Sequence, residues 1–465
     1  MKHFFLWPGA LILTTLLTGC ASPAPEPQTQ ALLPDDWNTP IAAATAGSPI
    51  ATDRWWTRFK SNELNQLIEQ AMQANFDLLA SWQRIEQART RLSSSRATLF
   101  PQLDASYSAS SNSQWDEDGD QQGSTESDRF GLSASYEIDL WGQLRAGTEA
   151  AEAALAGSNF SYRTLALTLQ AQVASSYFQY LAASDRLRFA EESLSNSKQL
   201  LTLFQLQFRE GSASRLELVQ QQSSVISQQA QINSLRNSLQ QIRYALDLLL
   251  GQKPGTLELT GYSLENIHLP AIAAGQPADL LQRRPDVLQA EAALAAAHAS
   301  VDVARAAFYP SLRITAGASA SQLFIGNPVT QIASLAASLT APLFDAGRNR
   351  SEYRRTLAAQ EEALLNYYQT LLTAVGEVQT SLVNVAQLSD NIQLQQRRLA
   401  LSNESYALAE LLYKEGSADF ITLLDAERSL ISAQDVYVQA ALQRHLEAVT
   451  LYKALGGSWD SPEIP

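Results

Sequence analysis

Two widely separated parts of this 465-residue chain have the same sequence pattern. The run FREGSA, which begins at Phe208, returns about 205 residues later as YKEGSA, which begins at Tyr413. Upstream, FPQL from Phe100 returns as YPSL from Tyr309, and each copy opens a pair of alternating runs. Solenoid repeats have periods of about 20–50 residues, so this period is too long for a solenoid. The sequence therefore predicts a half-molecule that is present twice, as two internal repeats per chain.

Each half contains one helix far longer than the helices of ordinary globular domains. Residues 143–208 and 348–413 contain no proline, and at 1.5 Å per residue each helix would be about 100 Å long. Shorter returning helices are expected over 216–250 and 420–455, the last with nearly a heptad spacing of apolar residues. Only 17% of the residues are charged. The fold is therefore predicted to be mainly α, with long helices packed on both sides as walls.

Alternation of apolar and polar residues predicts four strands, over residues 102–112, 129–141, 311–321 and 332–343. Each run is about 10 residues long, which is the length of a tilted strand that crosses a bilayer. A half-buried sheet of a soluble protein has the same alternation, but aromatic residues near the ends of these runs favour membrane strands. The acidic segment 113–128 is predicted to be an external loop. Because four strands cannot close alone, several chains are expected to share one membrane β-barrel.

The N-terminal segment predicts a lipid-anchored protein. Residues 1–19 have the features of a signal peptide, with an apolar core too short to span a bilayer as a helix. The sequence LTGC ending at Cys20 resembles a bacterial lipobox, so Cys20 is predicted to become the acylated N-terminus, carrying fatty acids such as palmitate. Residues 20–60 are expected to be mainly a tether. No later segment has about 18 consecutive apolar residues, so no transmembrane helix is expected.

Composition argues against several functional classes. The net charge of −14 is unfavourable for binding nucleic acid. Cys20 is the one cysteine, so no disulfide within the chain is expected. His268, His298 and His445 are scattered and have no second ligand at metal-binding spacing. We therefore expect no catalytic site, no metal site and no cofactor apart from the covalent lipid.

Five further motifs are shared with a known family. They are Asp139-Leu140-Trp141-Gly142, Gln282-Arg283-Arg284-Pro285-Asp286-Val287, Pro342-Leu343-Phe344-Asp345-Ala346-Gly347-Arg348, Leu423-Leu424-Asp425-Ala426-Glu427-Arg428 and Leu451-Tyr452-Lys453-Ala454-Leu455-Gly456-Gly457. Together with the lipobox, they resemble the outer-membrane factors of tripartite efflux pumps. These form the TolC-like family, and the likeness is to its lipidated OprM/NodT-type branch. It extends over nearly the whole mature chain.

The resemblance implies a TolC-like α/β-barrel. Three identical chains would form one shared twelve-stranded barrel in the outer membrane and a twelve-helix tunnel across the periplasm. The first repeat would cover 61–251, an equatorial linker 252–277, the second repeat 278–457, and a tail 458–465. The partners implied are a periplasmic adaptor and an inner-membrane pump, chiefly of the RND type. The duct itself would be passive, in the outer membrane of a Gram-negative bacterium.

The same resemblance places a gate at the periplasmic ends of the helices. Asp425 matches an aspartate that rings the closed pore, where three carboxylates would favour cations and respond to pH. A second ring position of the family is Thr422 here, so a double aspartate ring is not expected. A hydrophobic constriction near Ile421 is the alternative to a second aspartate ring.

Further tip positions match residues that hold the family's gate shut or bind the adaptor. Tyr413 and Glu217 match positions whose hydrogen bonds and ion pairs close the tip. The arginine partner of the family maps to Ala418, so Arg215 or Arg428 is expected to replace it. The adaptor-docking surface is predicted to be formed by the two turns, with residues Gly211, Ser212, Ala213, Gly416, Ser417 and Ala418.

Four functions are compatible with these features. The leading hypothesis is efflux of drugs or other small molecules, a function associated with antibiotic resistance. Copper or silver efflux and type I protein export use similar outer channels and remain alternatives. A lipidated periplasmic coiled-coil scaffold is the alternative from another class, but such a scaffold has no need for membrane-length strands.

Overall fold

The computed structural model describes residues 32–34, 36–37, 54–115, 117–118, 121–261, 263–272, 275–323 and 328–457. The predicted signal peptide, Cys20 and the C-terminal tail lie outside the described residues. The chain divides into two compact units, which are described in turn.

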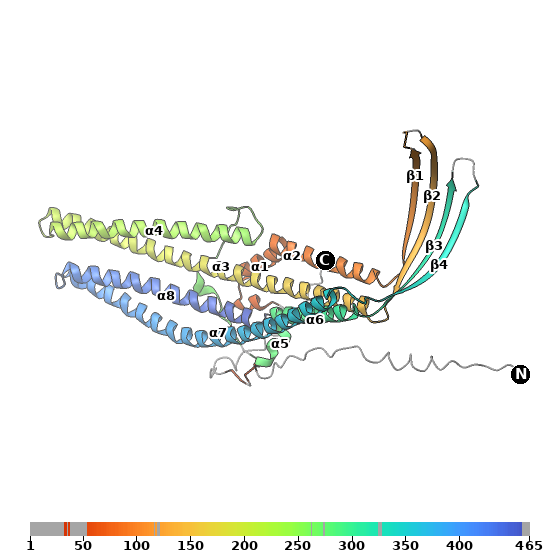
Figure 1. The fold of residues 1–465 in the computed structure, drawn as a ribbon. Coiled ribbons are helices and arrows are strands. Elements are labelled where there is room, and N and C mark those ends of the chain that lie inside the picture. Colours follow the sequence, from red (N-terminus) through yellow and green to blue (C-terminus); the bar gives the residue numbers. More distant parts are fainter. Residues whose placement is uncertain are drawn as a thin grey trace. The chain divides into compact units, whose positions relative to one another are not determined.

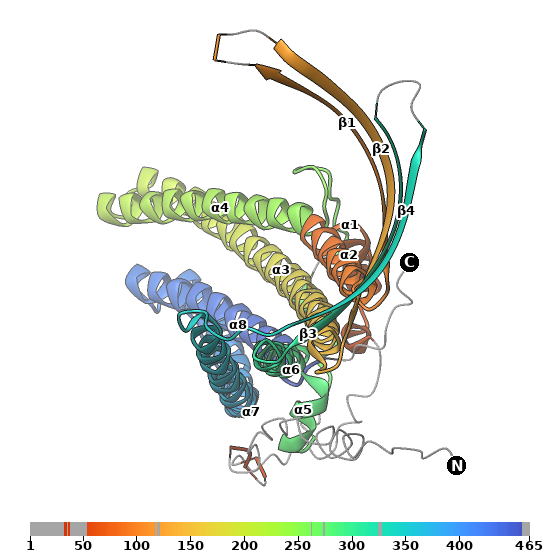
Figure 2. The ribbon, with the colours of Figure 1, turned by 45° about the vertical axis from the view of Figure 1, so that its right-hand side comes forward.

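The first unit contains one antiparallel sheet with the strand order β1-β2-β3-β4. The strands are β1 (Gln102–Trp115), β2 (Gln121–Ile138), β3 (Ser311–Leu323) and β4 (Thr330–Thr340). They lie side by side and curve together (Figures 1 and 2). The unit also contains much of α2 (Phe76–Ala97), most of α6 (Pro285–Ala306) and the first turns of two long helices. β1 and β4 are the edge strands of this sheet.

The first hairpin is longer than predicted, and the expected loop over 113–128 is wrong for most of its length. β1 and β2 stay paired from Gln102↔Ser135 to Trp115↔Gln121, with an irregularity at Gln114. Side chains on both faces of this upper part are mostly polar. The alternation that predicts strands therefore disappears there, although backbone pairing continues.

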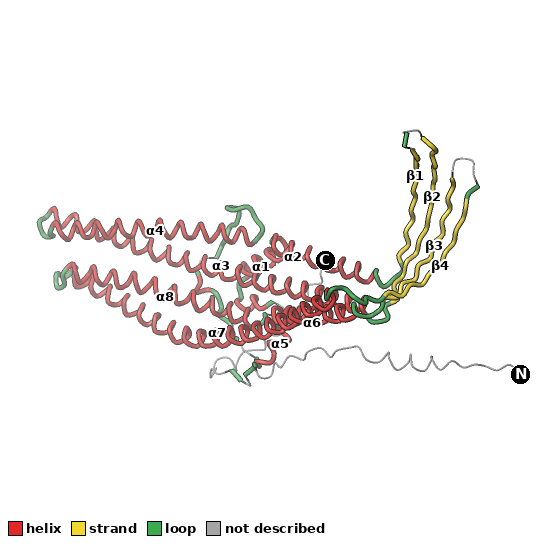
Figure 3. The backbone as a smooth tube through the Cα atoms, viewed as in Figure 1, coloured by secondary structure: helices red, strands yellow, loops and turns green. Residues whose placement is uncertain are grey.

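The second unit consists mainly of two helical hairpins (Figure 3). The first is formed by α3 (Gln143–Arg209) and α4 (Arg215–Leu249), and the second by α7 (Arg348–Lys414) and α8 (Phe420–Ala454). α3 and α7 both have 67 residues, and α4 and α8 both have 35. The early residues of α3 and α7 belong to the first unit. Nowhere in the described parts of the chain is a helix both long and apolar enough to cross a membrane.

The apolar periodicity that begins at Asn62 runs through two helices, α1 (Asn62–Ala74) and α2. The break occurs at Asn75, whose side-chain oxygen accepts hydrogen bonds from the backbone N–H groups of Asp77 and Leu78, at 3.0 and 3.1 Å. Its side-chain nitrogen donates to the Leu249 carbonyl at 3.0 Å. An asparagine in this position caps a new helix. Periodicity alone did not reveal the cap, because the apolar pattern continues across it.

A belt of buried residues joins the hairpins away from their tips. The short helix η2 (Trp55–Phe59) packs here, with the ring of Trp55 stacked on Tyr452 at 5.3 Å and that of Phe59 against Phe178 at 5.0 Å. Three short helices lie between the hairpins in sequence, and each has one buried residue: η3 (Leu264–Asn266), η4 (Pro277–Asp279) and α5 (Leu280–Arg283).

The second arginine of the Arg-Arg-Pro-Asp motif, Arg284, is buried and links three helices. The residue is only 6% exposed, and its guanidinium binds both carboxylate oxygens of Asp286, at 3.0 and 2.6 Å. It also contacts Glu377 of α7 at 2.8 Å and donates to the Ala454 carbonyl of α8 at 2.9 Å. One arginine therefore fixes the start of α6 to both helices of the second hairpin, since a buried charge is tolerated only with such partners.

Candidate gate at the helix tips

Each helical hairpin ends in the same kind of turn. Gly211 and Gly416 have φ angles of +77° and +74°, a left-handed conformation that glycine adopts without steric penalty. The N–H groups of Ser212 and Ala213 donate to the Gln207 carbonyl, and those of Ser417 and Ala418 donate to the Leu412 carbonyl. The glycine and serine of each predicted docking turn are exposed. The two turns therefore present similar backbone shapes to solvent.

An aromatic core lies directly behind these turns and joins the two hairpins. Phe204 of α3 is fully buried, and its ring lies 4.7 Å from Phe420 of α8 and 5.5 Å from Tyr413 of α7. The buried members of this core are Leu200, Phe204, Leu218, Ala409, Phe420, Leu423, Leu424 and Ala426. We call this set the tip core. It includes residues from all four helices, so separating the hairpins would expose it.

Tyr413 makes a polar link across the same contact. Its hydroxyl donates to the side-chain oxygen of Gln207 in α3, at 3.0 Å. Burial of the ring raises the pKa of Tyr413, and the negative charge of Glu217 raises it further. The tyrosine therefore stays protonated at neutral pH and remains a hydrogen-bond donor. Tyr413 was predicted to hold the tip, but its partner Gln207 was not predicted.

The predicted constriction residues lie on one face of α8. Phe420, Leu423 and Leu424 of this helix are buried in the tip core, whereas Ile421, Thr422 and Asp425 are exposed. Ile421 is 60% exposed, and the Asp425 side chain is 66% exposed. Helical geometry puts positions 421, 422 and 425 together on the side away from the chain's own core. This face is therefore available to another molecule or to a pore.

Four predicted gate residues, Asp425, Arg428, Glu217 and Arg215, have local partners in the chain. Arg428 lies 3.7 Å from Asp425, three residues earlier on the same helix. Glu217 accepts a hydrogen bond from the Ser214 backbone N–H at 2.6 Å and completes a capping box at the start of α4. The Arg215 guanidinium lies over the ring of Phe208, 5.9 Å from its centroid. No ion pair between the hairpins at the tip involves these side chains among the described residues.

A buried polar cluster continues the contact beyond the tip core. Glu427 of α8 is 4% exposed and accepts a hydrogen bond from Gln228 of α4 at 3.2 Å. Gln228 and Gln221 also donate to the hydroxyl of Ser197 in α3, at 3.3 and 2.8 Å. Burial raises the pKa of the Glu427 carboxyl above its usual range. Groups from three helices therefore meet at the Glu427 carboxyl, and burial makes ionisation of this carboxyl unfavourable.

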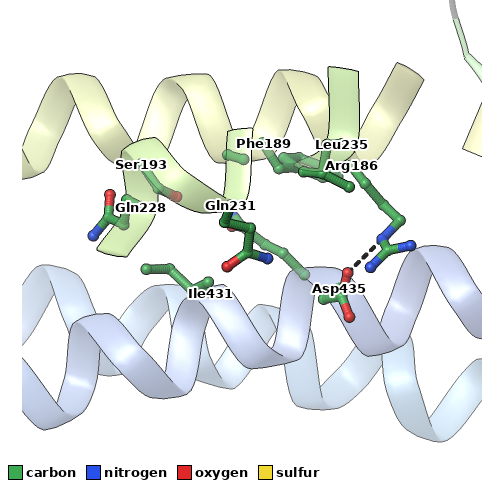
Figure 4. A pocket seen from close by; sticks show the side chains of 10 residues that line it. Arg186, Phe189, Ser193, Gln228, Gln231, Leu235, Ile431 and Asp435 are labelled. Carbon is green, nitrogen blue, oxygen red and sulfur yellow. Dashed lines mark hydrogen bonds and ion pairs between the residues drawn. The ribbon is translucent and has the colours of Figure 1, made fainter. Parts of the chain in front are cut away.

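Farther from the tip, an ion pair bridges the same two hairpins (Figure 4). Arg186 of α3 donates to the carboxylate of Asp435 in α8 at 2.6 Å. The pair borders a cavity of about 30 Å³ between α3, α4 and α8, with Gln228 at its other end. A cavity of this size has room for water. The contact from Tyr413 to Asp435 therefore contains apolar and polar layers in turn, and we call it the hairpin seam.

The sequence contains a signal for the missed residues of the seam. Buried and half-buried positions of α4 follow a heptad spacing at Leu218, Gln221, Val225, Gln228, Ile232 and Leu235. On α8, Glu427 falls between Leu424 and Ile431 in the same spacing. Polar residues at such seam positions are costly unless they are paired. Their presence indicates partners on a facing helix.

Comparison with known proteins agrees with this geometry. The family model for outer membrane efflux proteins matches residues 67–252 and 277–457. The pyoverdine export outer membrane protein OpmQ of Pseudomonas aeruginosa is 36% identical over 464 residues, which cover 97% of each chain. The cation efflux system protein CusC of Escherichia coli K12 is 32% identical over 454 residues, covering 95% of this chain and 97% of CusC.

A solved structure of the outer-membrane channel OprN superimposes with a TM-score of 0.85 at 26% identity, covering 95% of this chain and 99% of OprN. A structure of CusC superimposes with a TM-score of 0.81 at 30% identity, covering 94% of this chain and all of CusC. The chain therefore belongs to the outer membrane efflux proteins, the TolC-like outer-membrane factors.

Proposed function

We propose that this protein is the exit duct of a tripartite efflux system, through which molecules delivered by a pump and an adaptor leave the cell. The observation that carries the proposal is the open sheet of the first unit. Its edge strands β1 and β4 have no partner among the described residues. Unpaired strand edges cannot lie in lipid, because each unsatisfied backbone group costs several kcal/mol there.

Three chains remove both edges. Pairing β4 of one chain with β1 of the next would give twelve strands and a closed barrel. The helices support the same assembly. Leu394, Leu401 and Leu408 of α7 are 65%, 58% and 52% exposed and are seven residues apart, so they form an apolar stripe. Val219 and Ile226 of α4, also seven residues apart, are 45% and 65% exposed. In the proposed homotrimer, the α7 stripe of one chain packs against α4 of the next.

The trimer would bring the exposed face of α8 to the threefold axis at the tip. Three Asp425 side chains would then form a ring that favours cations, and Ile421 would narrow the pore beside it. The turns at Gly211 and Gly416 would be the surface for the adaptor, because their backbone shape is exposed and repeated. A lipid on Cys20 would anchor each chain to the outer membrane.

The cargo is proposed to be small organic molecules. OpmQ, the relative with 36% identity, is described as exporting pyoverdine, which supports an organic cargo. CusC, at 32% identity, is described as a cation efflux protein, so metal-ion efflux is the second candidate. A passive duct accepts what its pump delivers, and the two cargoes are therefore distinguished by the partner pump rather than by the tunnel.

Conductance of the purified mature protein in planar bilayers, with its mass in detergent, tests the proposal. A trimer that forms small cation-selective channels is the expected result. A monomer without conductance would refute the duct and leave the scaffold as the better explanation. Deleting the gene and measuring both organic-compound export and copper tolerance then separates the two candidate cargoes.

A further inference from the structure

Arg129 of β2 lies on the face of the sheet opposite the apolar face. On β2, Phe130, Leu132 and Ala134 alternate with Arg129, Gly131 and Ser133. In the proposed barrel the apolar face must meet lipid, so Arg129 faces the lumen. The register puts Arg129 directly opposite Ser108 of β1 and Ser321 of β3.

The surroundings of Arg129 on this face are nearly all hydroxyl groups. Along β2 the flanking positions are Ser127 and Gly131, and pairing to these positions brings in residues of β1 and β3. The same-face neighbours with described side chains are Ser106, Ser108, Ser110, Ser127, Gly131, Ser319 and Ser321. Such small side chains leave the guanidinium accessible from the lumen. They also add hydrogen-bond donors beside it.

Carboxylates on the lumen face are set apart from Arg129. Asp104 is paired with Ser133, four residues along β2 from Arg129, which is about 13 Å along the strand. Glu137 is already paired with Arg313 of β3 at 3.0 Å. The nearest acid in the sequence, Asp128, alternates to the other face. The ion pairs between described residues therefore include Arg313 but not Arg129.

We propose that the Arg129 side chains of three chains form a lumen subsite for the acidic groups of exported molecules. This inference rests on the proposed trimeric duct and adds a substrate class to it, namely organic molecules that carry carboxylate or similar anionic groups. A guanidinium flanked by hydroxyls has the donor arrangement that binds carboxylates and phosphates. By symmetry the three cations lie at one height, so a multivalent anion meets all three.

The subsite would act on cargo near the end of its path. The lower lumen carries one carboxylate ring, from Asp104, and one internally paired ring, from Glu137 and Arg313. An anionic molecule that has passed these rings meets its first unpaired cations at Arg129. The attraction is moderate in a water-filled lumen and weakens with salt, so the subsite would favour passage without trapping the cargo.

Current block by citrate tests the subsite. Citrate, a trivalent carboxylate, is added to each side in turn of single channels formed by the full-length mature protein in planar bilayers. Block from the barrel side is expected, weaker at higher ionic strength. Arg129→Gln should weaken this block by about tenfold or more, because three cations are lost at once. Arg129→Lys, which keeps the charge, should retain most of it.

Asp104→Asn is the matched control within the same lumen. It changes the charge of a ring by the same magnitude but in the opposite direction, and it should not weaken the block by citrate. Equal block of wild type and Arg129→Gln, or no block of wild type from the barrel side, would overturn the subsite while leaving the duct intact. A protein that forms no channels at all would refute the proposed duct, and the subsite with it.

Discussion

Replacing Phe204 with alanine should open the tip. The Phe204 ring is fully buried in the tip core, and both of its ring contacts, with Phe420 and Tyr413, are made to the other hairpin. Phe→Ala substitutions in cores cost about 3–5 kcal/mol. Most of this loss falls on the contact between the hairpins, because the helices themselves keep their backbone bonds.

The loss of stability at the tip core determines how often the hairpin tips separate. If 3 kcal/mol acts on the seam, the equilibrium between joined and separated hairpins shifts by about 150-fold in each chain, since every 1.4 kcal/mol is tenfold. We therefore expect larger single-channel conductance and longer openings in planar bilayers. Phe204→Leu, which removes less of the ring, should give an intermediate increase and guards against a variant that fails to assemble.

Phe178→Ala is the matched control. Phe178 is also fully buried, but it packs in the belt against Phe59 rather than at the tip. It should lower the melting temperature about as much as Phe204→Ala does and leave conductance near the wild-type value. If Phe204→Ala lowers the melting temperature but leaves conductance unchanged, the tip core does not hold the gate.

Three further changes test other parts of the proposal. Burial in the joined seam raises the pKa of Glu427 above its value when the hairpins are separated. The carboxyl therefore favours the joined state most at a pH below the pKa of the separated state. This contribution is lost as pH rises through the pKa of the joined state. Wild-type conductance should rise along this interval, and Glu427→Gln should remove that part of the pH response. A persisting response would implicate other groups, such as Tyr406 of α7 and Arg428, which interact electrostatically with Glu427. Asp425→Ala should increase conductance and weaken cation preference in bilayers, and unchanged values for both would remove this residue from the constriction. Cys20→Ser should abolish metabolic labelling with palmitate, so retained label would contradict lipidation at this cysteine.

The fold could be predicted best in those segments where a single physical requirement determines the residue pattern. The long helices could be located because an uninterrupted apolar periodicity without proline has few other solutions. Strand pairing beyond the apolar zone was missed because polar residues occupy both faces there, as at the successive pairs Asn112↔Thr125 and Ser111↔Glu126. The spacing Ser214-x-x-Glu217 itself predicts the capping box that Glu217 forms, in addition to the gate role that the resemblance implies.

Side-chain partners across the seam were beyond prediction for a different reason. Tyr413 and Gln207 are 206 positions apart, and Gln228 and Glu427 are 199 apart. Neither separation in sequence can be predicted from a local pattern. A polar residue at a seam position indicates that a partner exists, but only the packing of the hairpins decides which residue it is.

The two halves have become complementary at the seam rather than remaining equivalent. Donors for two links come from the first half, at Arg186 and Gln228, and the acceptors Asp435 and Glu427 come from the second. Their counterparts, about 205 residues away, are the residues Asn391, Ala433, Ala230 and Gln222. None of these counterparts carries a charge.

This difference separates the two kinds of helix contact in the proposed trimer. The contact of α7 with α4 of the next chain corresponds to the contact of α3 with α8 within one chain, yet it would contain the leucine stripe and no counterpart of the ion pair between Arg186 and Asp435. The leucine stripe contains no titratable group, whereas the buried carboxyl of Glu427 responds to pH. Opening of the tip in response to pH should therefore begin at the hairpin seam within each chain, while the contacts between chains hold the trimer together.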